Sequence, residues 1–294
     1  MSPLPQPLTR IGSSVSTLAS HAYTLFLFSK SDIKTTLIPV SFFALGAAPL
    51  SPTRRFAHAI QAIFWIYLHL FQFNLANQVR DPEEDRQNKP WRPLPSGRIT
   101  LKNAYRLKKL AIATCLFVSW CYGYRVLRTS AFFSILIPAY HELHGDSHWL
   151  SKNLMNAVGY ACFASGSTLI ASKDRSQLDF TGTLAISVIS AILATTIQAQ
   201  DFQDVEGDSL VGRKTLPIVF PNLSRLTPIV TLLLWSFYLT SIWEINTLAT
   251  VAFFTLALVV GTRYYLWRSV KDDQMSYFLY NVSVLTPLQP FGGF

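Results

Sequence analysis

Residues 180–208 read FTGTLAISVISAILATTIQAQDFQDVEGD, an apolar stretch without a charged side chain up to residue 200 that is followed directly by acidic residues. A helix needs about 20 mostly apolar residues to cross a bilayer, so residues 180–200 are predicted to span a membrane. The acidic residues then lie where this helix leaves the apolar layer. The stretch therefore predicts a membrane helix with a polar site at one end.

The composition of the whole chain agrees with an integral membrane protein. Of its 294 residues, 50% are hydrophobic and only 14% are charged, and the mean hydropathy is +0.28. Soluble domains carry roughly a quarter of charged residues. On the criterion of length and apolar character, nine segments are predicted to span the membrane. These segments are residues 34–50, 56–79, 105–124, 129–145, 153–172, 180–200, 226–243, 246–266 and, most weakly, 275–291.

The basic residues predict an orientation. The net charge of +9 could indicate a nucleic-acid partner, but Lys and Arg interrupt apolar segments instead of forming one stripe, so nucleic acid is not expected. With nine spans, 19 of the 25 basic residues lie on the side of the amino terminus. The positive-inside rule therefore places the amino terminus and two acidic clusters, at residues 81–85 and 201–208, in the cytosol. The endoplasmic reticulum is the expected membrane.

The amino-terminal residues 1–20 are set apart from the predicted membrane domain, residues 21–294. They contain three prolines and many Ser and Thr residues, and they lack the organisation of a signal peptide. A flexible tail is expected.

A further acidic cluster follows the apolar segment 56–79. Asn77, Asp81 and Asp85 are spaced i, i+4 and i+8, so on a continuous helix they share one face. Pro82 disfavours helix at the residue before it. Either the helix kinks there, or Asp81 caps a new short helix with Pro82 in its first position. In the second case Asn77 is the least certain member of the row.

The carboxylates after residue 200 form a second row. Asp201, Asp204 and Asp208 are spaced i, i+3 and i+7, again on one helix face. Two facing rows of carboxylates repel each other unless a cation lies between them. Oxygen ligands without His or Cys select a hard cation such as Mg²⁺ or Ca²⁺, and Mg²⁺ commonly binds a few carboxylates together with substrate phosphates.

Basic residues follow both rows and suggest an anionic substrate. Apolar helices surround this predicted site, so the substrate is expected to have an anionic head and an apolar tail, as a prenyl diphosphate does. The alternative is that each cluster is only a solvated loop of mixed charge. The bases expected to contact the diphosphate are Arg86, Lys89, Arg92, Arg98, Arg213 and Lys214.

The sequences NQVRDPEED and DFQDVEGD, the second with the trailing GRKTLP, resemble the two aspartate-rich motifs of the UbiA superfamily of intramembrane prenyltransferases. The resemblance implies an all-α bundle around a central cavity, in which Mg²⁺ ions bridge the motifs to a prenyl diphosphate. It implies catalytic roles for Asp81, Asp85, Asp201 and Asp208. The implied metal ligands are these four residues together with Asn77 and Asp204.

Other positions extend the resemblance or depart from it. Lys152 resembles the family lysine that opens the fifth helix and contacts diphosphate, and Lys34 is expected to act similarly from the first helix. The family usually has Asp where this chain has Gln78, and Pro82 also departs from the motif. These departures, with NKPWRPLPSGRI at residues 88–99, are similar to the fungal branch that includes UbiA-type terpene cyclases.

Three functions are separated by what happens to the prenyl chain. In a cyclase acting on farnesyl or geranylgeranyl diphosphate, the chain's own double bond attacks the allylic cation, and aromatic faces stabilise the charge. In a prenyltransferase, an aromatic or polyketide acceptor captures it. A transporter or membrane scaffold would do neither. The residues expected in the prenyl pocket, each with packing as its alternative role, are Phe71, Phe73, Tyr140, Asn156, Tyr160, Phe163 and Tyr280.

The sequence HELHGDSH at residues 141–148 has a different interpretation. HELH is one residue short of the HExxH zinc motif, so its histidines are spaced i, i+3 instead of i, i+4. A polar connection at the membrane edge is expected there.

Overall fold

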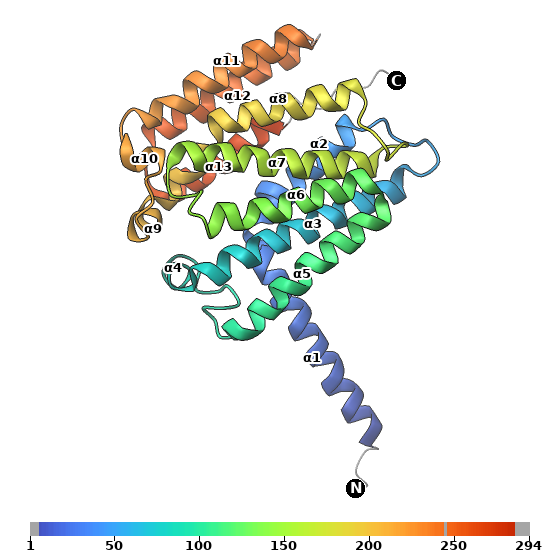
Figure 1. Cartoon of the computed structure of the whole chain (residues 1–294). Helices are drawn as coiled ribbons and strands as arrows, with labels where there is room; N and C mark the ends of the chain where they lie inside the picture. Colours follow the sequence, from blue (N-terminus) through green and yellow to red (C-terminus); the bar gives the residue numbers. More distant parts are fainter. Residues whose placement is uncertain (1–5, 244–245, 286–294) are drawn as a thin grey trace.

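Apolar runs form helices throughout residues 6–243 and 246–285, which the computed structural model describes, and no β-strand occurs among these residues (Figure 1). Short 3₁₀ or π helices connect some of the α-helices: η1 (Lys30–Asp32), η2 (Ile33–Leu37), η3 (Ile197–Asp204) and η4 (Ser224–Leu226). The α-helices are α1 (Gln6–Ser29), α2 (Ile38–Ala47), α3 (Arg55–Arg80), α4 (Pro82–Asn88), α5 (Leu101–Tyr122), α6 (Tyr124–His141), α7 (Trp149–Ala171), α8 (Phe180–Thr196), α9 (Val205–Leu210), α10 (Leu216–Val219), α11 (Thr227–Ile242), α12 (Thr247–Leu266) and α13 (Val270–Leu285).

The prediction of nine membrane spans is not confirmed. Among the described residues, five helical stretches are long and apolar enough to cross a membrane. Helix α2 has 10 residues and α13 has 16, and the end of the predicted ninth segment, 286–291, lies outside the described residues. The first turns of α5 contain four basic residues, and this helix is not among the five stretches. The five stretches are Arg55–Arg80, Trp149–Ala171, Phe180–Leu210, Ser224–Ile242 and Thr247–Leu266.

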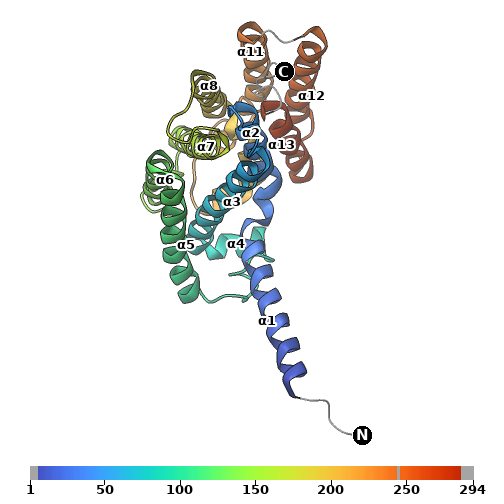
Figure 2. The same cartoon turned by 90° about the vertical axis from the view of Figure 1, so that its right-hand side faces the viewer.

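The amino-terminal segment is helical where the structure describes it. Helix α1 includes residues 6–20 of the expected tail, and it projects away from the bundle in both views (Figures 1 and 2). Pro7 lies in the first turn, where a missing N–H leaves no helical hydrogen bond unmade, and no later proline interrupts the helix. Helix α1 runs without a break past residue 20 to Ser29, so residues 6–20 are not irregular, and the division of the chain at residue 20 stays a prediction. The flexibility of the segment also stays a prediction.

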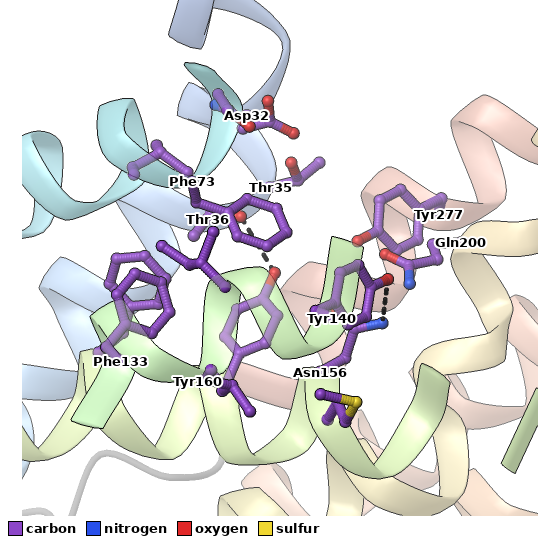
Figure 3. Close-up of a pocket in the computed structure, with 17 residues that line it drawn as sticks. Asp32, Thr35, Thr36, Phe73, Phe133, Tyr140, Asn156, Tyr160, Gln200 and Tyr277 are labelled. Atoms are coloured by element: carbon purple, nitrogen blue, oxygen red, sulfur yellow. Dashed lines mark hydrogen bonds between the residues drawn. The ribbon is translucent and has the colours of Figure 1, made fainter. Parts of the chain in front are cut away.

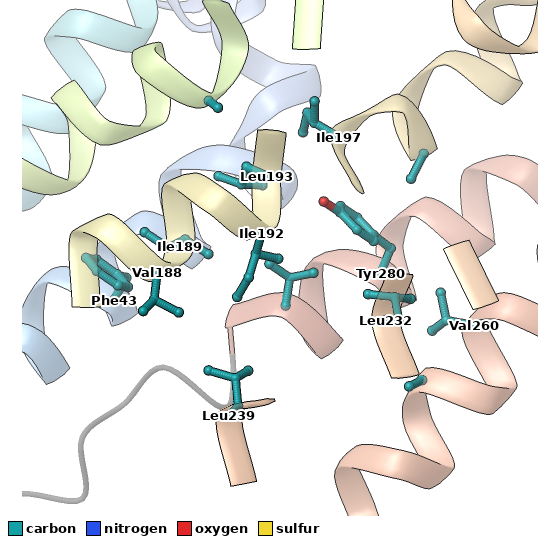
Figure 4. Packing of buried hydrophobic residues seen from close by; sticks show 14 of the residues in the cluster. Phe43, Val188, Ile189, Ile192, Leu193, Ile197, Leu232, Leu239, Val260 and Tyr280 are labelled. Atoms are coloured by element: carbon teal, nitrogen blue, oxygen red, sulfur yellow. The ribbon is translucent and has the colours of Figure 1, made fainter. Parts of the chain in front are cut away.

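The bundle is held by helices that pack side by side, with three clusters of buried apolar residues between them in the described part of the chain. Helix α3 contacts α5, α6 and α7, while α7 contacts α8 and α11 pairs with α12. One cluster joins α2, α8, α11, α12 and α13 through buried residues that include Phe43, Ile192, Leu232, Val260 and Tyr280 (Figure 4). This packing fixes α8 and hence the start of η3, which carries the second acidic cluster.

Helix α7 packs against α3 at a glycine. A Cβ at Gly166 would lie 2.2 Å from the Trp65 ring. The same ring donates its Nε1–H to Ser119 Oγ of α5 at 2.8 Å. Trp65 thus joins three helices, and its indole needs the space that Gly166 leaves.

Gly166→Ala is expected to lower the free energy of unfolding by about 1–3 kcal/mol, because the added methyl overlaps a buried ring that cannot move away. The apparent melting temperature of the purified protein in detergent measures this effect. Gly159→Ala is the matched control on the same helix, since its nearest neighbour would lie at an ordinary 3.7 Å. Equal melting temperatures for the two variants would contradict this packing.

The acidic clusters lie at one end of the bundle. The carboxyl end of α3 with α4, and η3 with α9, meet at that end, and α4 contacts α9 (Figure 1). At the other end, the loops after α2 and α7 meet, and the Lys173 N–H donates to Pro49 O at 2.9 Å. The topology therefore brings two motifs that are far apart in the sequence to the same site.

Candidate functional site

Pro82 divides the first acidic cluster between two helices. Helix α3 ends at Arg80, Asp81 precedes α4, and Pro82 begins it. Pro82 thus lies in the first position of a new helix, as the second of the two predicted arrangements has it, but the Asp81 side chain makes no capping hydrogen bond. The break interrupts the predicted helical row. Asp81 is not among the residues that line the cavity formed by the others, and it pairs with Arg80 at 3.3 Å and with Arg213, a residue of the cavity wall, at 3.6 Å.

The second cluster is formed by two helix types. After Thr196 the chain tightens into η3, a 3₁₀ helix in which residues three apart lie above one another, so Asp201 and Asp204 stack. Helix α9 then carries Asp208. All three carboxylates line one cavity, although the helix is not a continuous α-helix as predicted.

That cavity, termed the polar cavity, has a volume of about 160 Å³ and receives side chains from both clusters. Besides the carboxylates it is lined by bases from three separate parts of the chain. The residues predicted to bind metal or diphosphate that the structure brings together here are Asn77, Asp85, Lys89, Arg92, Lys152, Asp201, Asp204, Asp208 and Arg213.

Lys152 holds two carboxylates of the second cluster. Its Nζ lies 2.8 Å from Asp201 Oδ1 and 3.2 Å from Asp208 Oδ2. The exposed fractions of the three side chains are only 9%, 1% and 2%. Buried charges of this kind are tolerated when they are paired. Removal of one partner leaves the other charge buried and unpaired, which lowers the stability of the folded protein.

Two arginines complete the charge network. Arg213 contacts Asp208 at 2.8 Å and Asp146 at 3.1 Å, while Arg92 contacts Asp85 at 2.6 Å. Burial raises the pKa of Asp85, although Arg92 and Lys89 act in the opposite direction. The cavity therefore gathers opposite charges, with bases directed at the same space as the acids.

The donor set fits a hard cation. Asp85 Oδ2 and Asp201 Oδ2 are buried and have no hydrogen-bond partner among the described residues, so each has lone pairs to offer. Residues 6–243 and 246–285 contain no preformed group of three or more His, Cys, Asp or Glu side chains arranged for a metal. Asp85, Asp201 and Asp208 are instead distributed around the cavity in pairs with bases. Asn77 is a further oxygen donor on its wall.

Four predicted diphosphate-binding bases lie outside the polar cavity. Arg86 is exposed and pairs with Glu83 at 2.6 Å, because α4 begins a new helical phase and turns it outward. Arg98 is exposed and lies over the Tyr23 ring of α1 at 5.0 Å. The Lys214 N–H donates to Ser147 O at 2.7 Å, beside the loop before α7. Lys34 lines a neighbouring cavity, described below.

A second cavity, termed the aromatic pocket, has a volume of about 90 Å³ (Figure 3). Five of the residues predicted for a prenyl pocket line it. The Asn156 amide donates to Tyr140 Oη at 3.2 Å, and the hydroxyls of Thr36 and Tyr160 are hydrogen-bonded at 3.0 Å. The five residues are Phe73, Tyr140, Asn156, Tyr160 and Phe163.

Two predicted pocket residues serve packing instead. Phe71 is buried against Phe28 in an edge-to-face contact, with ring centroids 5.6 Å apart, because it lies on another face of α3. Tyr280 is buried in the core of α8 and α11–α13, where its hydroxyl is hydrogen-bonded to Thr196 at 2.7 Å.

Several lining residues were not predicted from the sequence. Asn74 lies one turn before Asn77 on α3, and Tyr277 one turn before Tyr280 on α13, so helical spacing could have found both. Asp32 lies in η1, where the helix type changes, and periodicity gives no signal for it. The other residues missed include Phe133, His141, Asp146 and Gln200.

The polar cavity and the aromatic pocket adjoin each other. A charged chamber thus leads directly into one lined by aromatic rings, and ring faces can stabilise a positive charge. The arrangement suits a molecule with an anionic head and an apolar, cation-forming tail. The residues that line both cavities are Asp32, Phe73, Asn74, Tyr140, Asn156 and Gln200.

The sequence matches known proteins over most of its length. The model of the UbiA prenyltransferase family matches residues 36–282. The fumagillin beta-trans-bergamotene synthase of Aspergillus fumigatus is 33% identical over 270 residues, 90% of each chain. A diterpene cyclase of Hericium erinaceus is 31% identical, covering 90% of this chain and 85% of the relative. A polyprenyl transferase of the same fungus is also 31% identical, covering 87% and 88%.

Solved structures share the fold. A UbiA homolog from Archaeoglobus fulgidus bound to GPP and Mg²⁺ superposes with a TM-score of 0.60, over 90% of this chain and 99% of that one, at 14% identity. At this identity the likeness concerns the arrangement of the helices alone.

Proposed function

The chain belongs to the UbiA prenyltransferase family of membrane enzymes, and from this membership and the two adjoining cavities we propose that it is a Mg²⁺-dependent terpene cyclase. Its substrate is farnesyl or geranylgeranyl diphosphate, which it ionises and cyclises with release of diphosphate. The reaction belongs to terpenoid secondary metabolism. Two relatives named as terpene synthase or cyclase, each covered over most of its length, support this proposal.

The observation that carries the proposal is the direct junction of the polar cavity with the aromatic pocket. The diphosphate lies among Lys152, Arg92 and Arg213, and the isoprenoid chain extends past Phe73 and Tyr140. Because both rings line both cavities, the first carbon of the chain lies beside them when its bond to oxygen breaks.

The side chains of the site have different roles in the proposed reaction. Lys152 and Arg213 donate hydrogen bonds to the departing diphosphate, and their carboxylate partners hold them in place. Asn77, Asp85, Asp201, Asp204 and Asp208 are the oxygen donors that would hold Mg²⁺. When bound, this ion neutralises charge on the leaving diphosphate. Tyr160 and Phe163 shape the chain and face the migrating positive charge.

We place the enzyme in the membrane of the endoplasmic reticulum with the polar cavity toward the cytosol. The five apolar helical stretches support an integral membrane protein. The cytosolic orientation rests on the distribution of Lys and Arg, because the end of the bundle opposite the acidic clusters has few of them.

A prenyltransferase is the second candidate, favoured by a third cavity. This cavity, of about 720 Å³, shares Asp32, Lys89, Gln200 and Asp204 with the polar cavity and is also lined by Lys34. It has room for an acceptor next to the ionising carbon. The similarity to a polyprenyl transferase gives this alternative further support.

Incubation without an acceptor separates the two reactions. Membranes containing the protein are supplied with farnesyl or geranylgeranyl diphosphate and Mg²⁺, and the extract is analysed by gas chromatography and mass spectrometry. A cyclic hydrocarbon or terpene alcohol is expected. Product that forms only after an aromatic or polyketide acceptor is added would instead assign the prenyltransferase reaction.

A further inference from the structure

His141 is a buried side chain of the polar cavity to which the proposed reaction assigns no role. It is the last residue of α6, it is only 2% exposed, and it lines the cavity together with Lys152 and Arg213. Neither of its ring nitrogens has a hydrogen-bond partner among the described residues. A buried imidazole without partners is costly, so the polar space beside it is expected to supply one.

A second buried histidine, His69, has a structural role and provides a comparison for His141. His69 of α3 is fully buried, but its Nδ1 is hydrogen-bonded to Trp65 O at 2.9 Å and its Nε2 to Ser130 Oγ at 2.7 Å. Both nitrogens are satisfied by the protein. His141 differs in that its polar atoms remain available on the wall of a cavity.

The loop after α6 folds back over the helix end that carries His141. The Gly145 N–H donates to Ala139 O at 3.2 Å, and the Asp146 N–H donates to Tyr140 O at 3.2 Å, so the chain folds back over the helix end. A Cβ at Gly145 would lie 2.9 Å from Ala139 O, which shows how closely the loop approaches. The sequence 141–148 is therefore a wall of the site as well as the polar connection expected of it.

The rings around His141 place it at the junction of the two cavities. Its ring centroid lies 5.2 Å from that of Phe73 and 4.9 Å from that of Tyr140. Both neighbours line the aromatic pocket and the polar cavity. Beside them, the buried Asp146 carboxylate holds Arg80 at 2.9 Å and Arg213 at 3.1 Å. His141 thus lies near the bases on one side and the aromatic rings on the other.

We propose that His141 is a substrate-contacting residue whose ring N–H donates a hydrogen bond to an oxygen of the diphosphate. This inference rests on the proposed function. As the bond from carbon to the bridging oxygen breaks, the electron pair stays on that oxygen, and the added charge on the diphosphate strengthens the hydrogen bond. His141 therefore stabilises the leaving group at the point where the apolar chain separates from it.

Binding of inorganic pyrophosphate tests this role without requiring turnover. Calorimetric titration of the purified protein with pyrophosphate in the presence of Mg²⁺ gives an affinity for each variant. His141→Phe, which keeps a planar ring but has no N–H, is expected to bind about tenfold more weakly and to release diphosphate from a prenyl diphosphate about 10- to 100-fold more slowly. His141→Gln can donate from its amide and is expected to recover most of the pyrophosphate affinity.

His58→Phe is the matched control, since His58 is a buried histidine at the opposite end of α3, where its Nδ1 contacts Ser172 O at 3.0 Å. It should bind pyrophosphate as the unmodified protein does. Unchanged pyrophosphate affinity in His141→Phe would overturn the inference, whether or not its melting temperature falls. If the unmodified protein releases no diphosphate from prenyl diphosphates but His141→Phe still weakens pyrophosphate binding, the proposed function fails and the assignment of His141 stands.

Discussion

Asp201→Asn is expected to reduce diphosphate release from a prenyl diphosphate by about 100- to 1,000-fold. The carboxylate is almost fully buried, one oxygen contacts Lys152 and the other has no hydrogen-bond partner among the described residues. The amide keeps the shape but removes the negative charge that positions the lysine and offers a lone pair to a hard cation. Both contributions to leaving-group departure are therefore weakened by one substitution.

Release of inorganic pyrophosphate by the purified variant in detergent or nanodiscs measures this effect. Asp174→Asn is a suitable control, since Asp174 is an exposed residue at the opposite end of the bundle whose Oδ1 accepts a hydrogen bond from the nearby Ser176 N–H. The Asp174→Asn variant is expected to keep full activity. If Asp201→Asn retained activity within a few-fold of this control, the second acidic cluster would not be part of the site.

Lys152→Met is expected to abolish activity and also to lower stability. The substitution leaves Asp201 without its cationic partner in a buried position, and breaking a buried pair in this way typically costs about 3–5 kcal/mol. Asp208 keeps a cationic partner in this variant, because Arg213 still contacts it at 2.8 Å. Thermal unfolding of the purified protein, followed by intrinsic fluorescence, measures the loss.

A double variant separates this electrostatic effect from simple loss of packing. Lys152→Met combined with Asp201→Asn removes the unpaired charge, so it is expected to melt at a higher temperature than Lys152→Met alone while remaining inactive. Lys108→Met, which breaks a pair with the exposed Glu142, should change stability by less than about 1 kcal/mol. A Lys152→Met protein as stable as the Lys108→Met protein would contradict the buried network.

Much of the fold could be predicted, because the length of an apolar segment and the positions of the helix ends depend mainly on the local sequence. The ends of the segments 56–79 and 246–266 differ from those of α3 and α12 by at most one residue. The number of spans could not be predicted in the same way. Helix α2 is shortened by the π-helical turn before it, and α5 begins with basic residues, so similar apolar segments differ in their capacity to cross a bilayer.

The residues of the site could be predicted from the acidic clusters, but their arrangement could not. Asp85 and Asp208 line the polar cavity although neither row lies on one continuous α-helix, and Asp81, at the break where Pro82 starts a new helix, is not among the lining residues. The same break turns Arg86 outward. Asp32 and His141 lie at the ends of helical segments, and only tertiary packing brings them to the cavity wall. Spacing along one helix contains no information about such contacts.

Release of inorganic pyrophosphate by the unmodified protein tests the central claim most directly. The purified chain is supplied with farnesyl or geranylgeranyl diphosphate, with Mg²⁺ or with a chelator, and with no acceptor. Pyrophosphate release together with a cyclic product, lost on chelation and restored by Mg²⁺, is the predicted result. Absence of pyrophosphate release with both substrates in the presence of Mg²⁺ would contradict the account of the polar cavity and the aromatic pocket as a site that ionises and cyclises prenyl diphosphates.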